Sequence, residues 1–316
     1  MRRFFPKKLC EFRNCFIACY IVAIGMVGYY AYKSCQVFFD EKRSVMEVVA
    51  YKIASDLINI LDHSESSLNI INTKIIASDK SKESVANILL EAGKSYNQTL
   101  LKYELSTGKF YWIDNTNYLS ANSDVGLVAN PIDLSNRDYL QNTRIDSRKI
   151  YVGAPIIGAS SGQYVIPMGV GAEDSVGNYV GTMVVSFKLS DLADRYRKIA
   201  DEFKINFALL NSDNSIIVES VYGIYADDKK LFADLSMQKI NVAEEFIAPF
   251  SLTKRDNSYV VLRASDKYQY KILAGYQNKY LLQELGVKIA CCLLQFLIVT
   301  LFFVLAMFYL RKDCSV

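Results

Sequence analysis

The chain has 316 residues, 51% of them hydrophobic, and a formal net charge of +3 at pH 7. The flanks outside residues 36–288 carry eight basic and two acidic residues, so the region between the flanks is close to −3. A mildly acidic region without a basic run is a poor binder of nucleic acid, and we expect no nucleic-acid partner.

The first element is an apolar run from Cys15 to Tyr32 that contains no charged residue. At about 1.5 Å per residue, it covers roughly 27 Å as a helix, close to the thickness of a bilayer core. We predict a transmembrane helix over residues 15–33, preceded by a basic cytoplasmic tail over residues 1–14. A cleaved signal peptide is the alternative, but the run is long and no small-x-small cleavage site follows it, which favours an uncleaved anchor.

A second apolar run extends from Ile289 to Leu310 and is interrupted by only two polar residues. We predict that residues 278–310 form a helix that enters and spans the membrane, followed by a short cytoplasmic tail over residues 311–316. Basic residues are concentrated in both chain ends, and such residues mark the cytoplasmic side. Both termini are therefore expected inside, in the inner membrane of a bacterium, with the central region extracytoplasmic.

The seven cysteines all lie in the chain ends, the two apolar runs or the edges of these runs. None occurs from Gln36 to Ala290. The central region therefore needs no disulfide framework and offers no thiolate for catalysis or for a metal. Small extracellular animal modules often need such disulfides, so a bacterial cell envelope is the expected location.

Residues 34–80 are expected to form a long helical segment that leaves the membrane. Apolar residues recur at every fourth position from Val45 to Leu61, which is one face of a helix. The pattern breaks at His63-Ser64, where serine can cap a new helix, and then resumes. A further short helix is expected from Glu83 to Ala92 and ends at a glycine.

Residues 81–189 are expected to form a membrane-distal module built on an antiparallel sheet of about five strands. The hydrophobic pattern changes to period two, which is typical of strands, and QTLLKYEL and KFYWID read as a first hairpin that turns at Thr107-Gly108. Later hairpins turn at Ser160-Ser161-Gly162 and at Val176-Gly177-Asn178. The sheet is of ordinary size.

Residues 190–277 repeat this plan in shorter form as a membrane-proximal module. A connecting helix leads into a hairpin that turns at Asp213-Asn214, a helix is expected around Lys229 to Gln238, and a second hairpin turns at Ser265-Asp266. The repeat is one of architecture and not of residue identity.

Three short motifs carry a resemblance to a known family. They are Asp133-Leu-Ser-x-Arg137-x-Tyr139, Tyr151-x-Gly-x-Pro155 and Val176-Gly-Asn-Tyr-Val-Gly181. Together with the order of the elements, they resemble the double Cache domain, the extracytoplasmic sensor of bacterial chemoreceptors and sensor histidine kinases. The resemblance covers about residues 36–288. It implies an α+β fold with a long N-terminal helix and two PAS-like antiparallel-sheet modules in series, flanked by two transmembrane helices.

The resemblance implies that Arg137 and Tyr139 line a ligand pocket of the distal module, with Asp174 at its far wall. A guanidinium offers a planar fork for a carboxylate, and a tyrosine adds a hydroxyl and a flat wall. Tyr151 and Trp112 complete the candidate ligand-binding set. The amino-acid-binding subgroup carries Arg-x-Trp-Tyr where this chain has Arg-Asp-Tyr-Leu, so a small carboxylate is the expected ligand.

Three of these residues also have a structural interpretation. Arg137 can form an ion pair with Asp133 or Asp138, Tyr139 can be a core aromatic, and Asp174 can be a turn acid because a Gly-containing turn follows it. Which role each residue has depends on contacts that the sequence does not show.

Trp112 and Tyr151 can likewise be packing residues only. His63 is the single histidine and is interpreted as a helix-end residue. Gly169-Val-Gly171 lacks the rest of a dinucleotide fingerprint and is interpreted as part of a strand. No metal-ligand cluster, phosphate loop or nucleophile-base pair is recognisable, so we expect no enzyme activity, no metal and no cofactor.

The sequence thus predicts a membrane-anchored sensor that binds a small molecule and shifts the helices that enter the membrane by ~1–2 Å. The resemblance implies a parallel homodimer paired along the long helix. Only RKDCSV follows Leu310, so a separate partner is expected to carry the output, or the chain is the remnant of a longer receptor. The alternative is an envelope scaffold whose sheet modules bind a protein and whose pocket is vestigial.

Overall fold

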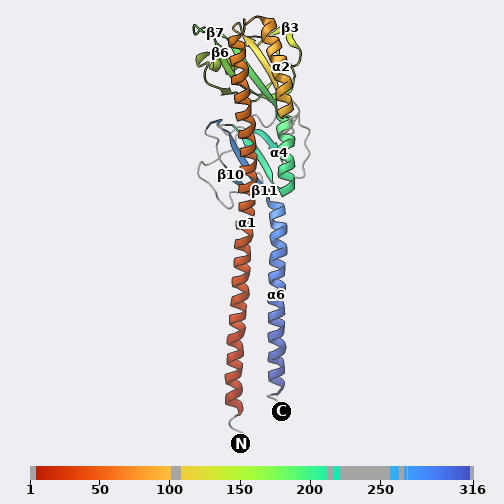
Figure 1. Cartoon of the computed structure of the whole chain (residues 1–316). Helices are drawn as coiled ribbons and strands as arrows, with labels where there is room; N and C mark the ends of the chain where they lie inside the picture. The colour runs from red at the N-terminus through yellow and green to blue at the C-terminus, as the bar shows by residue number, and fades with distance from the viewer. Residues whose placement is uncertain are drawn as a thin grey trace. The chain divides into compact units, whose positions relative to one another are not determined.

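The computed structural model describes residues 5–100, 108–211, 216–220, 257–262, 267–268 and 270–313. Within these residues the fold is α+β, with a long N-terminal helix, two antiparallel sheets and an apolar C-terminal helix, as predicted (Figure 1). The chain divides into two compact units. One unit contains Met1–Val45, Pro249–Ser258 and Tyr276–Val316, and the other contains Met46–Ala248 and Tyr259–Gly275.

Helix α1 runs without a break from Phe5 to Ala77. The helix break predicted at His63-Ser64 is therefore wrong. The Ser64 hydroxyl donates to the Ile60 carbonyl at 2.6 Å and lies 2.5 Å from the Tyr96 hydroxyl. A serine that bonds back to the residue four positions earlier is satisfied inside a helix and does not end it. The predicted apolar face of α1 is buried at Val49, Ile53, Leu57 and Leu61.

Helix α2 spans Lys82–Leu100 and is longer than predicted. Its buried residues Val85, Leu89 and Tyr96 continue a helical spacing past the expected end. Residues 98–100, which were expected to begin a strand, belong to this helix, while residues 101–107 lie outside the described residues. The first predicted hairpin is therefore wrong for residues 98–100.

The larger sheet has seven strands in the order β3-β2-β1-β7-β6-β4, with β5 also paired to β6. The strands are β1 (Lys109–Asp114), β2 (Tyr118–Asn122), β3 (Gly126–Asp133), β4 (Tyr151–Val152), β5 (Ile156–Ile157), β6 (Tyr164–Glu173) and β7 (Tyr179–Lys188). Helix α3 (Asp138–Ile145) lies between β3 and β4 in the chain.

Helices cover both faces of this sheet, so the long strands β6 and β7 are buried on both sides. On one face, the Tyr96 ring of α2 lies 4.6 Å from the Phe110 ring, and Asn72 of α1 donates to the Gly171 carbonyl at 2.9 Å. On the other face, α3 comes so close that a Cβ on Gly171 would lie 2.5 Å from the Thr143 carbonyl oxygen. The absence of a side chain at Gly171 therefore allows α3 to pack directly against the β6 backbone.

The smaller sheet follows helix α4 (Leu189–Phe203). It has the order β10-β11-β8-β9, with β8 (Asn206–Leu210), β9 (Ile216–Ser220), β10 (Asn257–Leu262) and β11 (Lys271–Gln277). The helix predicted around Lys229 to Gln238 and the two predicted turns at Asp213-Asn214 and Ser265-Asp266 lie outside the described residues. The module boundaries themselves stay predictions.

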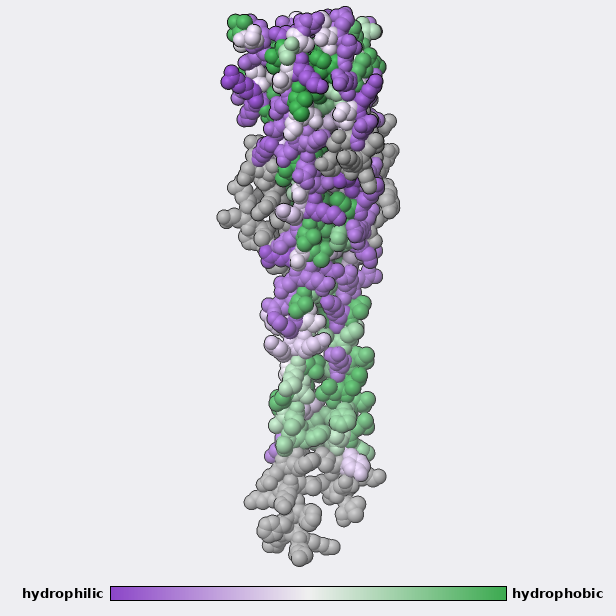
Figure 2. Space-filling view, viewed as in Figure 1, coloured by the Kyte–Doolittle hydropathy of each residue, from purple (hydrophilic) through white to green (hydrophobic). Residues whose placement is uncertain are grey.

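Helix α6 spans Asn278–Asp313 and begins directly after β11. The segments Asn14–Ala77 of α1 and Lys279–Tyr309 of α6 are long and apolar enough to cross a membrane, and their most apolar windows are not buried in the protein. Figure 2 shows the hydrophobic side chains gathered over these two helices. Within their own unit the helices touch: the Tyr20 and Phe303 rings stack at 4.0 Å, and the Tyr20 hydroxyl lies 3.1 Å from Thr300 Oγ1.

Candidate ligand-binding site

A cavity lies on the face of the seven-stranded sheet that α3 covers. Its volume is about 40 Å³, which leaves room for several water-sized groups. The polar residues that line it are Tyr111, Arg137, Tyr139, Ser160, Ser161 and Ser186, and the apolar ones include Ile113, Leu119, Leu134, Ile156, Val165, Pro167 and Val184. The cavity therefore combines a mainly apolar floor with a few convergent polar groups, which is typical of small-molecule sites.

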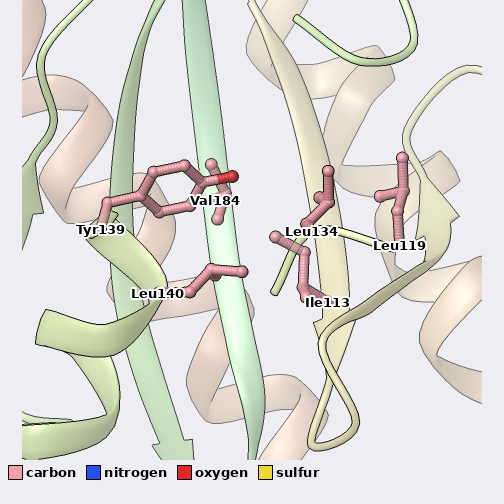
Figure 3. Close-up of a cluster of buried hydrophobic side chains, with 6 residues drawn as sticks. All are labelled: Ile113, Leu119, Leu134, Tyr139, Leu140 and Val184. Carbon is pink, nitrogen blue, oxygen red and sulfur yellow. The ribbon is translucent and has the colours of Figure 1, made fainter. Parts of the chain in front are cut away.

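The strand pattern explains which residues face the cavity. Side chains alternate between the two faces of a strand, so Tyr111 and Ile113 of β1 share a face and Trp112 points to the other. Tyr111 is paired with Val184 across β1 and β7, which places both on the cavity side. A cluster of buried side chains contains Ile113, Leu119, Leu134, Tyr139, Leu140 and Val184 (Figure 3), and all of them except Leu140 also line the cavity.

Arg137 stands immediately before α3, at its N-cap position, and is half-buried. Its Nη2 donates to the Ile157 carbonyl at 3.1 Å. Among the described residues it forms no ion pair with Asp133 or Asp138, and Asp133 instead accepts from the Ser135 backbone N–H at 2.9 Å. The other guanidinium N–H groups of Arg137 therefore have no protein acceptor within the described chain and are available at the cavity.

Tyr139 is both a core residue and a wall of the cavity. Its side chain is 7% exposed, and Figure 3 shows its ring projecting from α3 toward the strand that carries Val184. Burial raises the pKa of Tyr139 to about 12, and the nearby positive charge of Arg137 opposes this effect. The phenol therefore stays protonated at neutral pH, and no described residue forms a hydrogen bond with its hydroxyl.

The structure does not bring the other three candidates to this cavity. Trp112 packs on the opposite face of the sheet, where a Cβ on Gly181 would lie 2.5 Å from its ring. The ring of Tyr151 instead lies 5.4 Å from the Lys149 ammonium. Asp174 accepts backbone N–H groups of the following turn, as a turn acid does.

The bonds to Asp174 come from the backbone N–H of Asn178 at 2.8 Å and of Val176 at 2.9 Å, and the Asn178 side chain also donates at 3.0 Å. The Asn178 side chain and these N–H groups lower the pKa of Asp174, because they stabilise its charged form. This carboxylate is therefore committed to the β6–β7 turn.

Two cavity residues that the sequence reasoning missed are Tyr111 and Ser186. The period-two pattern of KFYWID puts Tyr111 on the face opposite Trp112, which is a usable signal. Nothing local in the sequence brings Ser186 to the same place, because this depends on how β7 pairs with β1 and β6.

The charge at the cavity comes from Arg137. Arg137 is the only charged residue among those that line the cavity in the described part of the chain. A cation with free N–H donors beside a largely apolar floor attracts a small anion and favours a carboxylate, which matches its planar fork. The same lining offers no carboxylate to an ammonium group.

Comparison with known proteins gives structural likeness only. No protein-family model matches the chain, and no curated protein matches it. The chain is similar to the ligand-binding domain of the Pseudomonas fluorescens chemoreceptor CtaA in complex with L-serine (TM-score 0.54, 15% identity, 76% of this chain and 98% of that chain). It is also similar to the ligand-binding domain of Mlp24 with asparagine (TM-score 0.52, 14% identity, 81% of this chain and 99% of that chain).

A third similar structure is an extracellular ligand-binding receptor from Desulfohalobium retbaense (TM-score 0.50, 12% identity). The match covers 72% of this chain but 39% of that receptor, so this chain spans well under half of its length. These likenesses show that the fold is that of chemoreceptor ligand-binding, Cache-type sensor domains, and the predicted resemblance is confirmed. Beside this fold, the chain has two helices that are long and apolar enough to cross a membrane.

Proposed function

We propose that the protein is a membrane-anchored extracytoplasmic sensor that binds a small carboxylate in the Arg137 cavity. The observation that carries the proposal is the half-buried guanidinium, which faces the cavity with unused N–H donors and no acidic neighbour in the lining. A hydrogen bond to a charged group contributes about 1.5–3 kcal/mol, which is enough to select a ligand by its carboxylate. The small volume favours an acid of a few carbon atoms.

The similar structures support a small-molecule ligand without identifying it. CtaA was solved with L-serine and Mlp24 with asparagine, and both ligands carry a carboxylate. In the present chain the guanidinium supplies the partner for that carboxylate. The protein acts by binding and not by catalysis, and it uses neither a metal nor a cofactor.

Ligand binding is relayed by the two helices that continue into the apolar spans. Helix α1 is a single element from the first apolar span to residues that pack on the seven-stranded sheet, and α6 starts where β11 ends. A shift of ~1–2 Å in these helices passes the signal to a separate partner on the cytoplasmic side, where both termini lie. A parallel homodimer paired along α1 is part of this proposal, and the exposed Val48 and Tyr51 of α1 support it.

The test is a ligand screen on the full chain in detergent micelles. Thermal unfolding is recorded with small carboxylates, amino acids and amines. A ligand at a hundred times its dissociation constant adds about 2.7 kcal/mol to the free energy of unfolding. We expect carboxylates to stabilise the protein and simple amines to have no effect.

Two matched variants locate the site. Arg137→Ala should abolish the stabilisation by carboxylates, whereas Arg148→Ala, which removes an exposed arginine outside the cavity, should keep it. If no small molecule stabilises the wild type and a protein partner copurifies with it, the envelope scaffold replaces the sensor.

A further inference from the structure

We infer that the ligand of the Arg137 cavity is a small hydroxy acid or oxo acid: a carboxylate with a second oxygen near it and no ammonium group. This inference rests on the proposed function, that the cavity binds a carboxylate, and names the class of carboxylate. It follows from two hydroxyls that border the cavity and have no partner among the described residues, and from the absence of an acid in the described cavity lining.

The two hydroxyls belong to Tyr139 and Ser186. Their side chains are 7% and 9% exposed, and both line the cavity. Neither hydroxyl forms a hydrogen bond with any residue in the described part of the chain. Hydroxyls that open into a cavity without a protein partner are available to hydrogen-bond with water or with a ligand that replaces it.

The two hydroxyls also stand on different walls of the cavity. Tyr139 belongs to α3, two residues after Arg137, and Ser186 belongs to β7, where it is paired with Pro167 of β6. A ligand held by Arg137 through its carboxylate therefore meets hydroxyl groups from the helix and from the sheet. Because the phenol of Tyr139 stays protonated, it can donate to a carbonyl or hydroxyl oxygen, and the serine can donate or accept.

An ammonium group finds no such match. The acids closest to Arg137 in sequence, Asp133 and Asp138, do not line the cavity, and Asp174 is bonded within its own turn. An amino acid would have to give up the hydration of its ammonium group without gaining a negative partner, which disfavours its binding. The cavity therefore selects oxygen at the position where an amino acid carries nitrogen.

Four probes of similar size separate the possibilities: propanoate, 2-hydroxypropanoate, 2-oxopropanoate and alanine. Their dissociation constants are measured on the full chain in detergent by titration calorimetry. We expect the hydroxy and oxo acids to bind about three- to tenfold more tightly than propanoate, since one neutral hydrogen bond contributes about that factor. Alanine should bind more weakly than propanoate.

Two conservative variants assign the effect to the hydroxyls. Tyr139→Phe and Ser186→Ala should each narrow the difference in dissociation constant between 2-hydroxypropanoate and propanoate. Tyr118→Phe, on a half-exposed tyrosine of β2 outside the cavity, is the control and should leave this difference intact.

The four-probe comparison on the wild type decides the inference even if a variant fails to fold. Equal affinities for propanoate and 2-hydroxypropanoate, or tightest binding of alanine, would overturn it while leaving the proposed function in place. If none of the four probes binds and no other carboxylate stabilises the protein, the proposed function fails instead.

Discussion

The two sheets of the described chain use the same kinds of polar residue in different ways. At the seven-stranded sheet, the Arg137 guanidinium makes one bond, to the Ile157 carbonyl at 3.1 Å, and faces a cavity. Beside the four-stranded sheet, the Arg195 guanidinium of α4 makes two bonds of 2.6 Å to the Asp56 carboxylate of α1. Arg137 therefore has N–H groups at the cavity that no described residue uses, whereas Arg195 links α4 to α1.

The tyrosines differ in the same way. The Tyr139 hydroxyl has no partner among the described residues, whereas the Tyr268 hydroxyl lies 2.6 Å from an Asp62 carboxylate oxygen and 2.8 Å from a Glu65 carboxylate oxygen, both on α1, and can donate its proton to either. The contrast holds for this pair of hydroxyls and not for every tyrosine, because the buried Tyr270 hydroxyl before β11 also has no partner among the described residues. The seven-stranded sheet thus carries the cavity of the proposed ligand, and the residues beside the four-stranded sheet form polar contacts with α1.

The largest effect should come from breaking the ion pair between Arg195 and Asp56. Arg195→Ala leaves the Asp56 carboxylate, which is 17% exposed, without its cation, and we expect a loss of about 2–3 kcal/mol in the free energy of unfolding. Arg137→Ala should cost less than about 0.5 kcal/mol, because its guanidinium faces a wet cavity. Chemical denaturation of the full chain in detergent measures both. Equal losses in the free energy of unfolding would show that Arg137 and Arg195 contribute equally to the stability of the fold.

The next effect concerns the close contact between α3 and the seven-stranded sheet. Gly171→Ala puts a Cβ 2.5 Å from the Thr143 carbonyl oxygen, whereas Gly169→Ala meets only side-chain carbons at 3.4 Å or more. We expect Gly171→Ala to cost about 1–3 kcal/mol through overpacking and to weaken ligand binding, because α3 carries Tyr139. Gly169→Ala should bind ligand as the wild type does. Normal ligand binding by Gly171→Ala would show that α3 does not set the cavity.

Much of the fold follows from local patterns in the sequence, whereas the wrong predictions concern features that depend on residues far apart in the sequence. The two apolar helices, the spacing along α1 and the turn glycines Gly162 and Gly177 are local signals, and the structure bears them out. Gly93 was expected to end a helix and instead lies inside α2. The expected break at Ser64 was wrong because a serine can cap a helix or bond back within it. The structure places the Tyr96 hydroxyl against it at 2.5 Å, and that residue is far away in sequence.

The candidate site shows the same limit. Arg137 and Tyr139 are near neighbours at the start of one short helix, and the structure brings both to one cavity. Tyr111 and Ser186 come to that cavity only through the pairing of β7 with its neighbours, and single-residue patterns do not encode this register. Asp174 accepts hydrogen bonds from the turn that directly follows it. The sequence shows this turn, so it already indicated that Asp174 could be a turn acid.

A third prediction compares the two tyrosines. Tyr268→Phe removes a hydroxyl that lies within hydrogen-bond distance of two carboxylates, and we expect a loss of about 1–2 kcal/mol in the free energy of unfolding. Tyr139→Phe removes a hydroxyl that no described residue uses, so its loss should stay below about 0.5 kcal/mol in the absence of ligand. Urea unfolding of the two variants side by side gives the answer. A larger loss in the free energy of unfolding for Tyr139→Phe would mean that the Tyr139 hydroxyl stabilises the folded protein even without ligand.

The smallest effect is a dependence of stability on pH that comes from Asp62 on α1. Burial by itself raises the pKa of Asp62, but the hydrogen bonds from Lys267 and Tyr268 outweigh it and hold this pKa below its usual value of 3.8. A carboxyl whose pKa is lowered by folding stabilises the folded state above its unfolded pKa and loses this contribution as the pH falls through the folded value. The contribution of Asp62 should therefore be complete at neutral pH and decline below about pH 4.

Lys267→Met tests this pH dependence, because it removes the ammonium that lies 2.6 Å from Asp62. We expect the variant to lose less stability than the wild type between about pH 5 and pH 3, in urea titrations at each pH. Lys94→Met, on an exposed lysine of α2, should follow the wild-type curve. If all three curves of stability against pH coincide, the ion pair between Lys267 and Asp62 does not stabilise the fold. The Tyr268 hydroxyl would then be the group that contributes to the contact with α1.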